Sequence, residues 1–244
     1  MMNEETYRKL REMNMSEMVE ALKYGETLNT FVNLTFDESL KIVIDQTYST
    51  KSTNKINRLI KNAKFRYKDA DLREIIYEDR DIEKQKVIEI SSLSFLTNKT
   101  NLILEGFAGC GKTWIGCALG KQACKLSKKT KYVRLPDLLQ ELDIKTQMVN
   151  GKQRLINQYS NYELLIIDEW LLTKMSGDEI RFIFEIIERR SGNYSTIFCT
   201  LYKENEWFKR LGGDTLANSL VDRIVHNVIS IKVGSTNMRK LLNQ

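Results

Sequence analysis

The stretch that decides the fold is Gly106-Phe-Ala-Gly-Cys-Gly-Lys-Thr113, which has the spacing G-x-x-x-x-G-K-[ST]. The apolar run 101–105 before it is typical of a buried strand, and residues 114–120 after it are typical of a helix. This order of strand, loop and helix separates a phosphate-binding loop from a glycine-rich turn that carries a surface lysine. The sequence therefore predicts that the chain binds a nucleoside triphosphate.

The backbone N–H groups of such a loop point inward beside a helix N-terminus and cradle phosphate oxygens. Lys112 is expected to lie along the β- and γ-phosphates, and the Thr113 hydroxyl to be a ligand of Mg²⁺. The predicted ATP-binding residues in the loop are Gly106, Phe107, Ala108, Gly109, Cys110, Gly111, Lys112 and Thr113.

A second motif lies downstream, where the apolar run 162–167 is followed by two carboxylates. Asp168 is expected to hold the Mg²⁺ shell, and Glu169 to orient and polarise the attacking water, so Lys112 and Glu169 are candidate catalytic residues. A lone Asp-Glu pair is usually a solvated strand end, but here it follows Leu-Leu-Ile-Ile. One apolar strand, 131–135, lies between the two motifs. This arrangement favours hydrolysis over phosphoryl transfer to a small acceptor.

The predicted nucleotide is ATP rather than GTP or a dinucleotide. Asn98-Lys-Thr-Asn101 lacks the aspartate of a guanine-reading N-K-x-D motif and precedes the loop, and no G-x-G-x-x-G occurs. Ile75, Ile76 and Tyr77 are candidates for packing over the adenine, with an ordinary core role as the alternative.

The 244 residues leave room for one ATPase domain and a small additional module. No apolar run approaches the ~20 residues of a membrane span, and the N-terminus lacks the apolar core of a signal peptide. The four cysteines show no C-x-x-C spacing, and the chain has one histidine. We therefore expect a cytoplasmic protein with reduced cysteines, no zinc site and no membrane partner.

A net charge of +6 suggests a polyanionic partner. Residues 51–68, the basic stretch, contain seven basic residues and no acid. Spacings of three and four place most of them along one side of a helix. The candidate contacts to double-stranded DNA are Lys55, Arg58, Lys61 and Lys64. The alternative is a solvated helix face.

Two segments differ in pattern. Residues 1–67 are predicted to form a small all-helical module, with helices at 4–13, 16–28, 35–46 and 52–66. Residues 68–244 are predicted to form the ATPase domain. A further helix is expected at 79–96. Beyond residue 100, predicted strands at 101–105, 131–135, 162–168, 195–199 and 228–233 alternate with helices at 112–126, 136–149, 176–190, 203–210 and 215–226. This alternation predicts an α/β fold whose parallel sheet is flanked by helices.

Several stretches together resemble the IstB family, the transposition helper ATPases encoded beside a transposase in one class of bacterial insertion sequences. They are the loop 106–113, Leu164-Leu-Ile-Ile-Asp-Glu-Trp170, Glu206-Trp207, Leu220-Val-Asp-Arg-Ile-Val-His226 and Thr236-Asn-Met-Arg239. The similarity runs through nearly the whole chain. A more distant resemblance is to DnaC-type helicase loaders.

The resemblance implies a P-loop AAA+ fold and an ATP site shared between subunits of a homo-oligomer. It also implies ATP-dependent binding of double-stranded DNA and recruitment or stimulation of a transposase. Arg223 would be the arginine finger, with an ion pair to Asp222 or Asp214 as the alternative. Arg239 would be a second phosphate sensor.

One departure from the family pattern concerns the strand after Glu169, where Leu201 occupies the position of a common amide sensor. Thr200 is the candidate substitute, and we expect a slow ATPase. The competing functions are a replicative helicase loader, a small-molecule kinase, and a DNA-binding scaffold in which the nucleotide is purely structural.

Overall fold

The computed structural model describes residues 3–78 and 80–241, and the chain divides into two compact units, one ending at Arg58 and the other beginning at Leu59. The division falls inside helix α3, Phe36–Ala63, and precedes the predicted boundary at residue 67. The physical reason is that Ala63 and Phe65 are buried in the core of the second unit. In the described part of the chain, no helix is both long and apolar enough to cross a membrane.

The N-terminal unit is built from α1, Glu4–Glu12, α2, Ser16–Thr27, and the first part of α3. Tyr7, Val19 and Val43 are buried, and the Tyr7 hydroxyl donates to Glu26 at 2.9 Å. A capping box opens α3, because the Thr35 N–H donates to the Glu38 carboxylate at 2.8 Å and the Glu38 N–H donates to the Thr35 hydroxyl at 3.3 Å.

The prediction of separate helices at 35–46 and 52–66 was wrong, since α3 is continuous. Neither proline nor glycine occurs between residues 36 and 63. Thr47, at the expected break, donates its hydroxyl to the Val43 carbonyl at 2.6 Å. This bond within the helix satisfies the polar group that would otherwise compete with helical hydrogen bonding.

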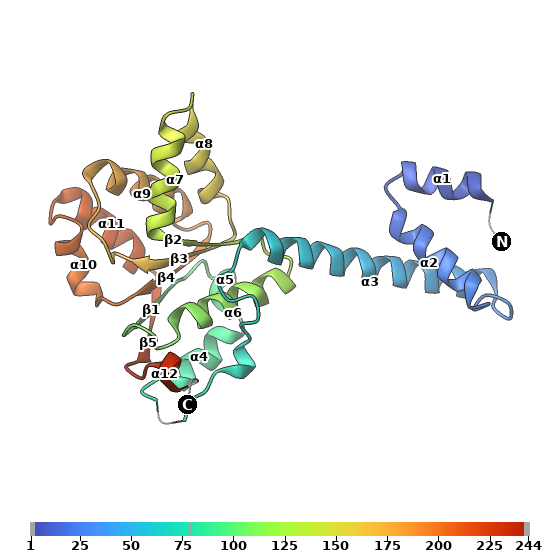
Figure 1. Cartoon of the computed structure of the whole chain (residues 1–244), viewed down its shortest axis with the longest axis horizontal. Coiled ribbons are helices and arrows are strands. Elements are labelled where there is room, and N and C mark those ends of the chain that lie inside the picture. The colour runs from blue at the N-terminus through green and yellow to red at the C-terminus, as the bar shows by residue number, and fades with distance from the viewer. Residues whose placement is uncertain (1–2, 79, 242–244) are drawn as a thin grey trace. The chain divides into compact units, whose positions relative to one another are not determined.

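The second unit contains a five-stranded, all-parallel sheet in the order β2-β3-β4-β1-β5 (Figure 1). Its strands are β1, Asn101–Gly106, β2, Thr130–Arg134, β3, Leu164–Trp170, β4, Ser195–Thr200, and β5, Val228–Gly234. The predicted α/β fold with a helix-flanked parallel sheet is confirmed.

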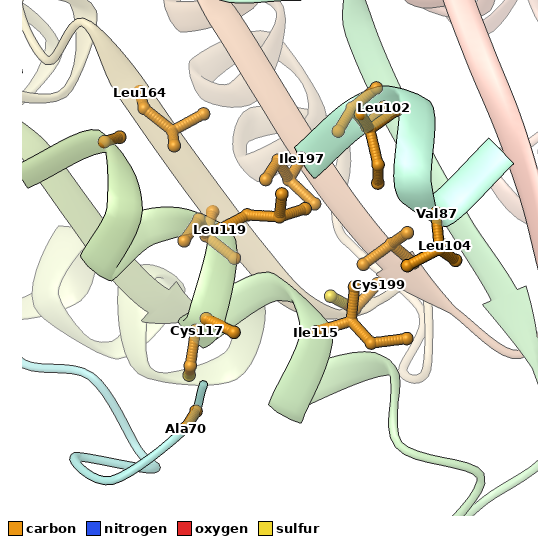
Figure 2. Close-up of a cluster of buried hydrophobic side chains, with 14 of the residues drawn as sticks. Ala70, Val87, Leu102, Leu104, Ile115, Cys117, Leu119, Leu164, Ile197 and Cys199 are labelled. Carbon is orange, nitrogen blue, oxygen red and sulfur yellow. The ribbon is translucent and has the colours of Figure 1, made fainter. Parts of the chain in front are cut away.

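Helices cover both faces of this sheet. Successive strand residues point to opposite sides, and apolar side chains on each side must be covered. Leu102 and Leu104 pack with Ile115 and Leu119 in one cluster (Figure 2), whereas Ile103 belongs to the other. The first cluster is covered by α4, Lys84–Ser91, α5, Ser94–Thr97, and α6, Lys112–Lys125. The second is covered by α7, Leu135–Thr146, α8, Gly151–Ser160, α9, Gly177–Arg190, α10, Glu204–Arg210, and α11, Thr215–Val225. Two short helices complete the unit, η1, Leu72–Glu74, and α12, Met238–Leu241.

Two predicted helices differ from the structure. The helix expected at 79–96 begins only at Lys84, because Glu83 pairs with β5: its carboxylate accepts from the Lys232 N–H at 2.7 Å, and its own N–H donates to the Lys232 carbonyl at 3.2 Å. Leu93, with φ of 60°, then separates α4 from α5. The helix expected at 136–149 ends at Thr146, and the following α8 was not predicted.

Arg190, the last residue of α9, connects three segments of the sheet layer. Its guanidinium is fully buried and donates to the carbonyls of Tyr162 and Ser195, each at 2.6 Å, and to the Thr196 hydroxyl at 2.9 Å. Burial lowers the pKa of Arg190 to about 9. These hydrogen bonds offset the cost of burying the charge, and they join the starts of β3 and β4 to α9.

We expect Arg190→Met to lower the free energy of unfolding by about 3 kcal/mol, because it leaves buried carbonyls without donors. Chemical denaturation followed by circular dichroism measures this change. The control is Arg189→Met on the same helix, where an exposed side chain pairs with Glu185; its expected effect is within ~0.5 kcal/mol. Equal effects of the two substitutions would contradict the role given to Arg190.

Candidate active site

The glycine-rich loop follows β1 and leads into α6, as its sequence predicts. Gly109 has φ of 82°, and a Cβ built on it would lie 2.5 Å from Oδ1 of Asn237. A Cβ on Gly106 would lie 2.7 Å from Cys110 Sγ and 2.8 Å from the Gly234 carbonyl oxygen. Glycine is therefore required at both positions, at Gly109 by backbone conformation as well as space.

The side chain of Lys112 is folded against this loop. Its Nζ donates to the carbonyl oxygens of Gly106, at 2.6 Å, and Phe107, at 2.7 Å, and only 8% of the residue is exposed. The ammonium thus lies where phosphate oxygens would be cradled, and backbone carbonyls satisfy two of its donors.

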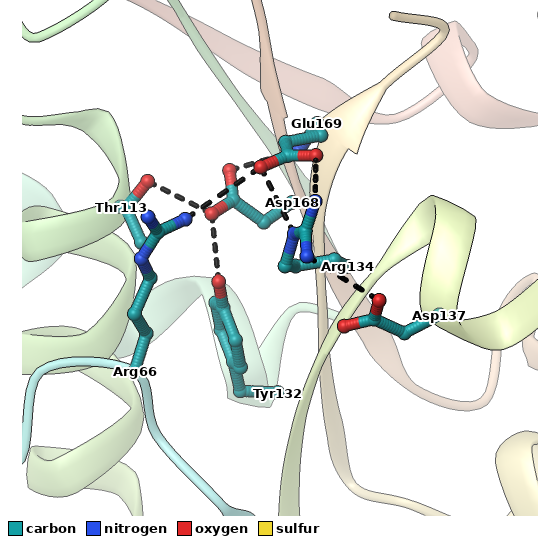
Figure 3. Close-up of polar contacts among 7 residues, drawn as sticks. All are labelled: Arg66, Thr113, Tyr132, Arg134, Asp137, Asp168 and Glu169. Carbon is teal, nitrogen blue, oxygen red and sulfur yellow. Dashed lines mark hydrogen bonds and ion pairs between the residues drawn. The ribbon is translucent and has the colours of Figure 1, made fainter. Parts of the chain in front are cut away.

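Asp168 is the centre of a hydrogen-bond network at the carboxyl end of β3 (Figure 3). Its Oδ2 accepts from the hydroxyls of Thr113 and Tyr132, each at 2.8 Å, and its Oδ1 accepts from the Glu169 N–H at 2.9 Å. The two residues predicted to bind Mg²⁺, Thr113 and Asp168, are therefore brought together. Burial, together with the negative charge of Asp168, raises the pKa of Tyr132, so this phenol stays protonated and donates.

Glu169 is held by two arginines. Arg134 donates to both of its carboxylate oxygens, with Nε at 3.0 Å and Nη2 at 2.8 Å, and Arg66 Nη1 lies 3.6 Å from Oε1 (Figure 3). The Glu169 backbone has φ of 56°, and the pairing of β3 with β4 is irregular between Ile167 and Trp170. A non-glycine residue in the left-handed region is unusual, and such strain clusters at functional sites.

The hydrogen bonds to Glu169 raise the pKa of Arg134, so this guanidinium stays charged. Arg134 occupies one lone pair on each oxygen of the Glu169 carboxylate, and each oxygen keeps a second lone pair that can accept from a water.

A cavity of about 390 Å³ opens beside the loop, a size typical of small-molecule sites. Lys112 and Thr113 line it, together with apolar side chains from α6 and from segments distant in the sequence. These are Tyr67, Ile75, Ile76, Trp114, Ile115 and Met238. Ile75 and Ile76 line the cavity, whereas the Tyr77 ring faces Lys84, with Nζ 5.2 Å from its centroid, so packing over the adenine stays a prediction.

The hydroxyl of Thr200, the candidate substitute sensor, is engaged by backbone. It accepts from the Tyr202 N–H at 3.0 Å and donates to the Trp170 carbonyl at 3.3 Å, and the residue is buried. The neighbouring Leu201 is exposed. Trp170 packs edge-on against Phe198, with ring centroids 4.8 Å apart.

Arg223 lies on α11 and forms an ion pair with Glu188 of α9, not with Asp222 or Asp214. Its guanidinium also lies over the Phe184 ring, 5.1 Å from the centroid. Arg223 is not among the residues that line the cavity in the described part of the chain. The side chain of Arg239 lies outside the described residues, so its sensor role stays a prediction.

The four candidate DNA contacts are all exposed. Lys55, Arg58 and Lys61 belong to α3, and Lys64 follows the helix with φ of 57°. Exposure is compatible both with DNA contact and with a solvated face, and the assignment stays a prediction.

Sequence reasoning missed the site roles of Tyr132 and Arg134, although it predicted their strand, and it placed Arg66 only in the basic stretch. In the sheet Tyr132 is in register with Ile166, and Arg134 with Asp168. Their position near the carboxyl end of a predicted strand was the signal for both residues, because the carboxyl ends of neighbouring parallel strands meet at one edge of the sheet. The sequence did not show that this strand is the neighbour of β3.

Curated relatives share sequence with nearly the whole chain. A protein of Pseudomonas fluorescens, named as a predicted ATP-binding protein of insertion sequence IS1162, is 31% identical over 198 residues, which are 81% of this chain and 85% of that protein. A similarly named protein of Sinorhizobium fredii, y4uH, is 25% identical over 99% of this chain and 97% of its own length.

Solved structures share the fold. The crystal structure of DnaI has a TM-score of 0.58 and 22% identity and covers 69% of this chain and 90% of its own. AMPPCP-bound DnaA from Aquifex aeolicus has a TM-score of 0.57 and 19% identity, covering 70% of this chain and 51% of its own. At these identities the likeness shows the fold alone.

The family described as IstB-like ATP binding protein matches residues 8–243. This match spans the phosphate-binding loop, the Asp168 network and the N-terminal helices. The chain therefore belongs to the IstB-like ATP-binding protein family.

Proposed function

We propose that this protein binds ATP with Mg²⁺ and hydrolyses it. The observation that carries the proposal is the 2.8 Å hydrogen bond between Thr113 and Asp168, which joins the phosphate-binding loop to the carboxylate pair. The two oxygens are of the type that Mg²⁺ prefers, and Thr113 lines the cavity together with Lys112. Bound Mg²⁺ would neutralise charge that develops on the phosphate oxygens.

Four side chains have separate roles in the proposed hydrolysis. Lys112 exchanges its two loop carbonyls for β- and γ-phosphate oxygens, and Tyr132 keeps Asp168 oriented. Glu169, positioned by Arg134, orients the attacking water and accepts its proton.

We further propose that ATP times the assembly of a homo-oligomer on double-stranded DNA, where the protein recruits or stimulates a transposase. The support is the family match over residues 8–243 and relatives whose names refer to insertion sequences. A cytoplasmic location follows from this role. A transposase gene beside this one would support the proposal, and a replicative helicase gene would instead support a helicase loader.

Lys112→Ala should abolish tight ATP binding, because it removes the main cation from the β- and γ-phosphates. Glu169→Gln should keep binding and lose hydrolysis by about 10²–10⁴-fold, because the amide cannot accept the proton. Phosphate release and displacement of a fluorescent ATP analogue measure the two effects. Lys125→Ala, at the exposed end of α6, is the control and should change neither. Wild-type hydrolysis by Glu169→Gln would show that another group activates the water.

Arg223→Ala should leave ATP affinity nearly unchanged and slow hydrolysis by about 10³–10⁵-fold if Arg223 reaches a neighbouring subunit's phosphate. Mixing it with Lys112→Ala protein should restore part of the activity, because each supplies what the other lacks. Glu188→Gln is the control for the ion pair. If both substitutions lower stability alike and neither slows hydrolysis, Arg223 is only a partner of Glu188.

Neutralising Lys55, Arg58, Lys61 and Lys64 with glutamine should weaken duplex binding regardless of sequence. The slope of log affinity against log salt should flatten by up to ~0.9 per lost contact, because fewer counterions are released. Fluorescence anisotropy with labelled duplex at several salt concentrations measures it. Neutralising Arg8 and Lys9, exposed on α1, is the control. An unchanged slope in the fourfold variant would identify the basic stretch as a solvated face.

A further inference from the structure

Arg80 extends from the segment before α4 onto the phosphate-binding loop. Its Nη2 donates to the Cys110 carbonyl at 2.6 Å, and its Nη1 to the Ile76 carbonyl at 2.6 Å. The segment is also tied to the end of β5, because the Ser235 hydroxyl donates to Asp81 Oδ2 at 2.9 Å. Arg80 is thus held against the loop from outside the motif 106–113.

The guanidinium of Arg80 has binding capacity left over. Its Nε is buried and has no hydrogen-bond partner within residues 3–78 and 80–241. Its hydrogen bonds go to carbonyl oxygens, including that of Val233 at 3.4 Å. No carboxylate of the described residues forms an ion pair with the Arg80 guanidinium. Burial also lowers the pKa of Arg80. A partly desolvated cation with a spare N–H favours an anionic ligand.

The cavity beside the loop provides the place for that ligand. Arg80 lines it together with Lys112 and Thr113. A Cβ on Gly111 would lie 3.5 Å from Arg80 Nη2, so the guanidinium is next to the loop backbone itself. Glu74 also lines the cavity, and it is the one carboxylate among the described residues that do so.

We propose that Arg80 is a further nucleotide-binding residue, whose guanidinium donates to the phosphate chain of the nucleotide in this cavity. This inference rests on the proposed ATP binding. The phosphate chain is the anionic part of a nucleotide, and guanidinium groups match phosphate oxygens in charge and geometry. A purine base offers neutral acceptors, which would leave the charge of Arg80 unmatched.

Arg80→Gln tests the proposal through the affinities of ATP, ADP and adenosine, each measured by displacement of a fluorescent ATP analogue. ATP and ADP should bind roughly 10- to 100-fold more weakly, the range expected for losing a hydrogen bond to a charged group, and adenosine should bind as before. Arg73→Gln, an exposed arginine on η1 paired with Asp71, is the control and should leave all three affinities unchanged.

Equal losses for ATP and adenosine, or no loss for either, would overturn the proposal. If Arg80→Gln does not fold, Arg80→Lys decides, because it keeps the charge and loses the guanidinium. This variant should lower the ratio of ATP to adenosine affinity by about 3- to 10-fold, and an unchanged ratio would overturn the proposal. If the wild-type protein itself binds no nucleotide, ATP binding as a whole fails, which is a distinguishable result.

Discussion

The hydrogen bond between Thr113 and Asp168 is the interaction on which the site depends, because it joins two segments fifty-five residues apart. It can form only because the parallel sheet brings the carboxyl ends of β1 and β3 to the same edge, with β4 between them. The helix α6, which carries Thr113, packs on the face formed by Leu102, Leu104 and Ile166. Packing on that face therefore sets the distance between the loop and the Asp168 carboxylate.

A second constraint is how the positively charged side chains near this edge are held in place. Lys112 and Arg80 both donate to backbone carbonyls around the loop. Carbonyl dipoles hold these cations in place without neutralising them, so an arriving phosphate chain meets charge that is already positioned. Arg134 differs, since its partner is the full negative charge of Glu169.

The pairing of Glu169 with Arg134 gives the site a resting arrangement. Glu169 has a left-handed backbone conformation in an irregular part of β3, so its carboxylate turns toward β2. The backbone conformation and the ion pair together fix where this carboxylate lies.

The sequence by itself determined the phosphate-binding loop, the Asp168–Glu169 pair and the parallel sheet. Each is encoded locally, by residue spacing or by the alternation of apolar strands and helices. Only the tertiary structure decided that Tyr132 orients Asp168, that Arg134 holds Glu169 and that Arg80 reaches the loop. The physical reason is that these contacts depend on which strands are neighbours and on where the segment before α4 meets the loop. No local pattern of residues carries that information.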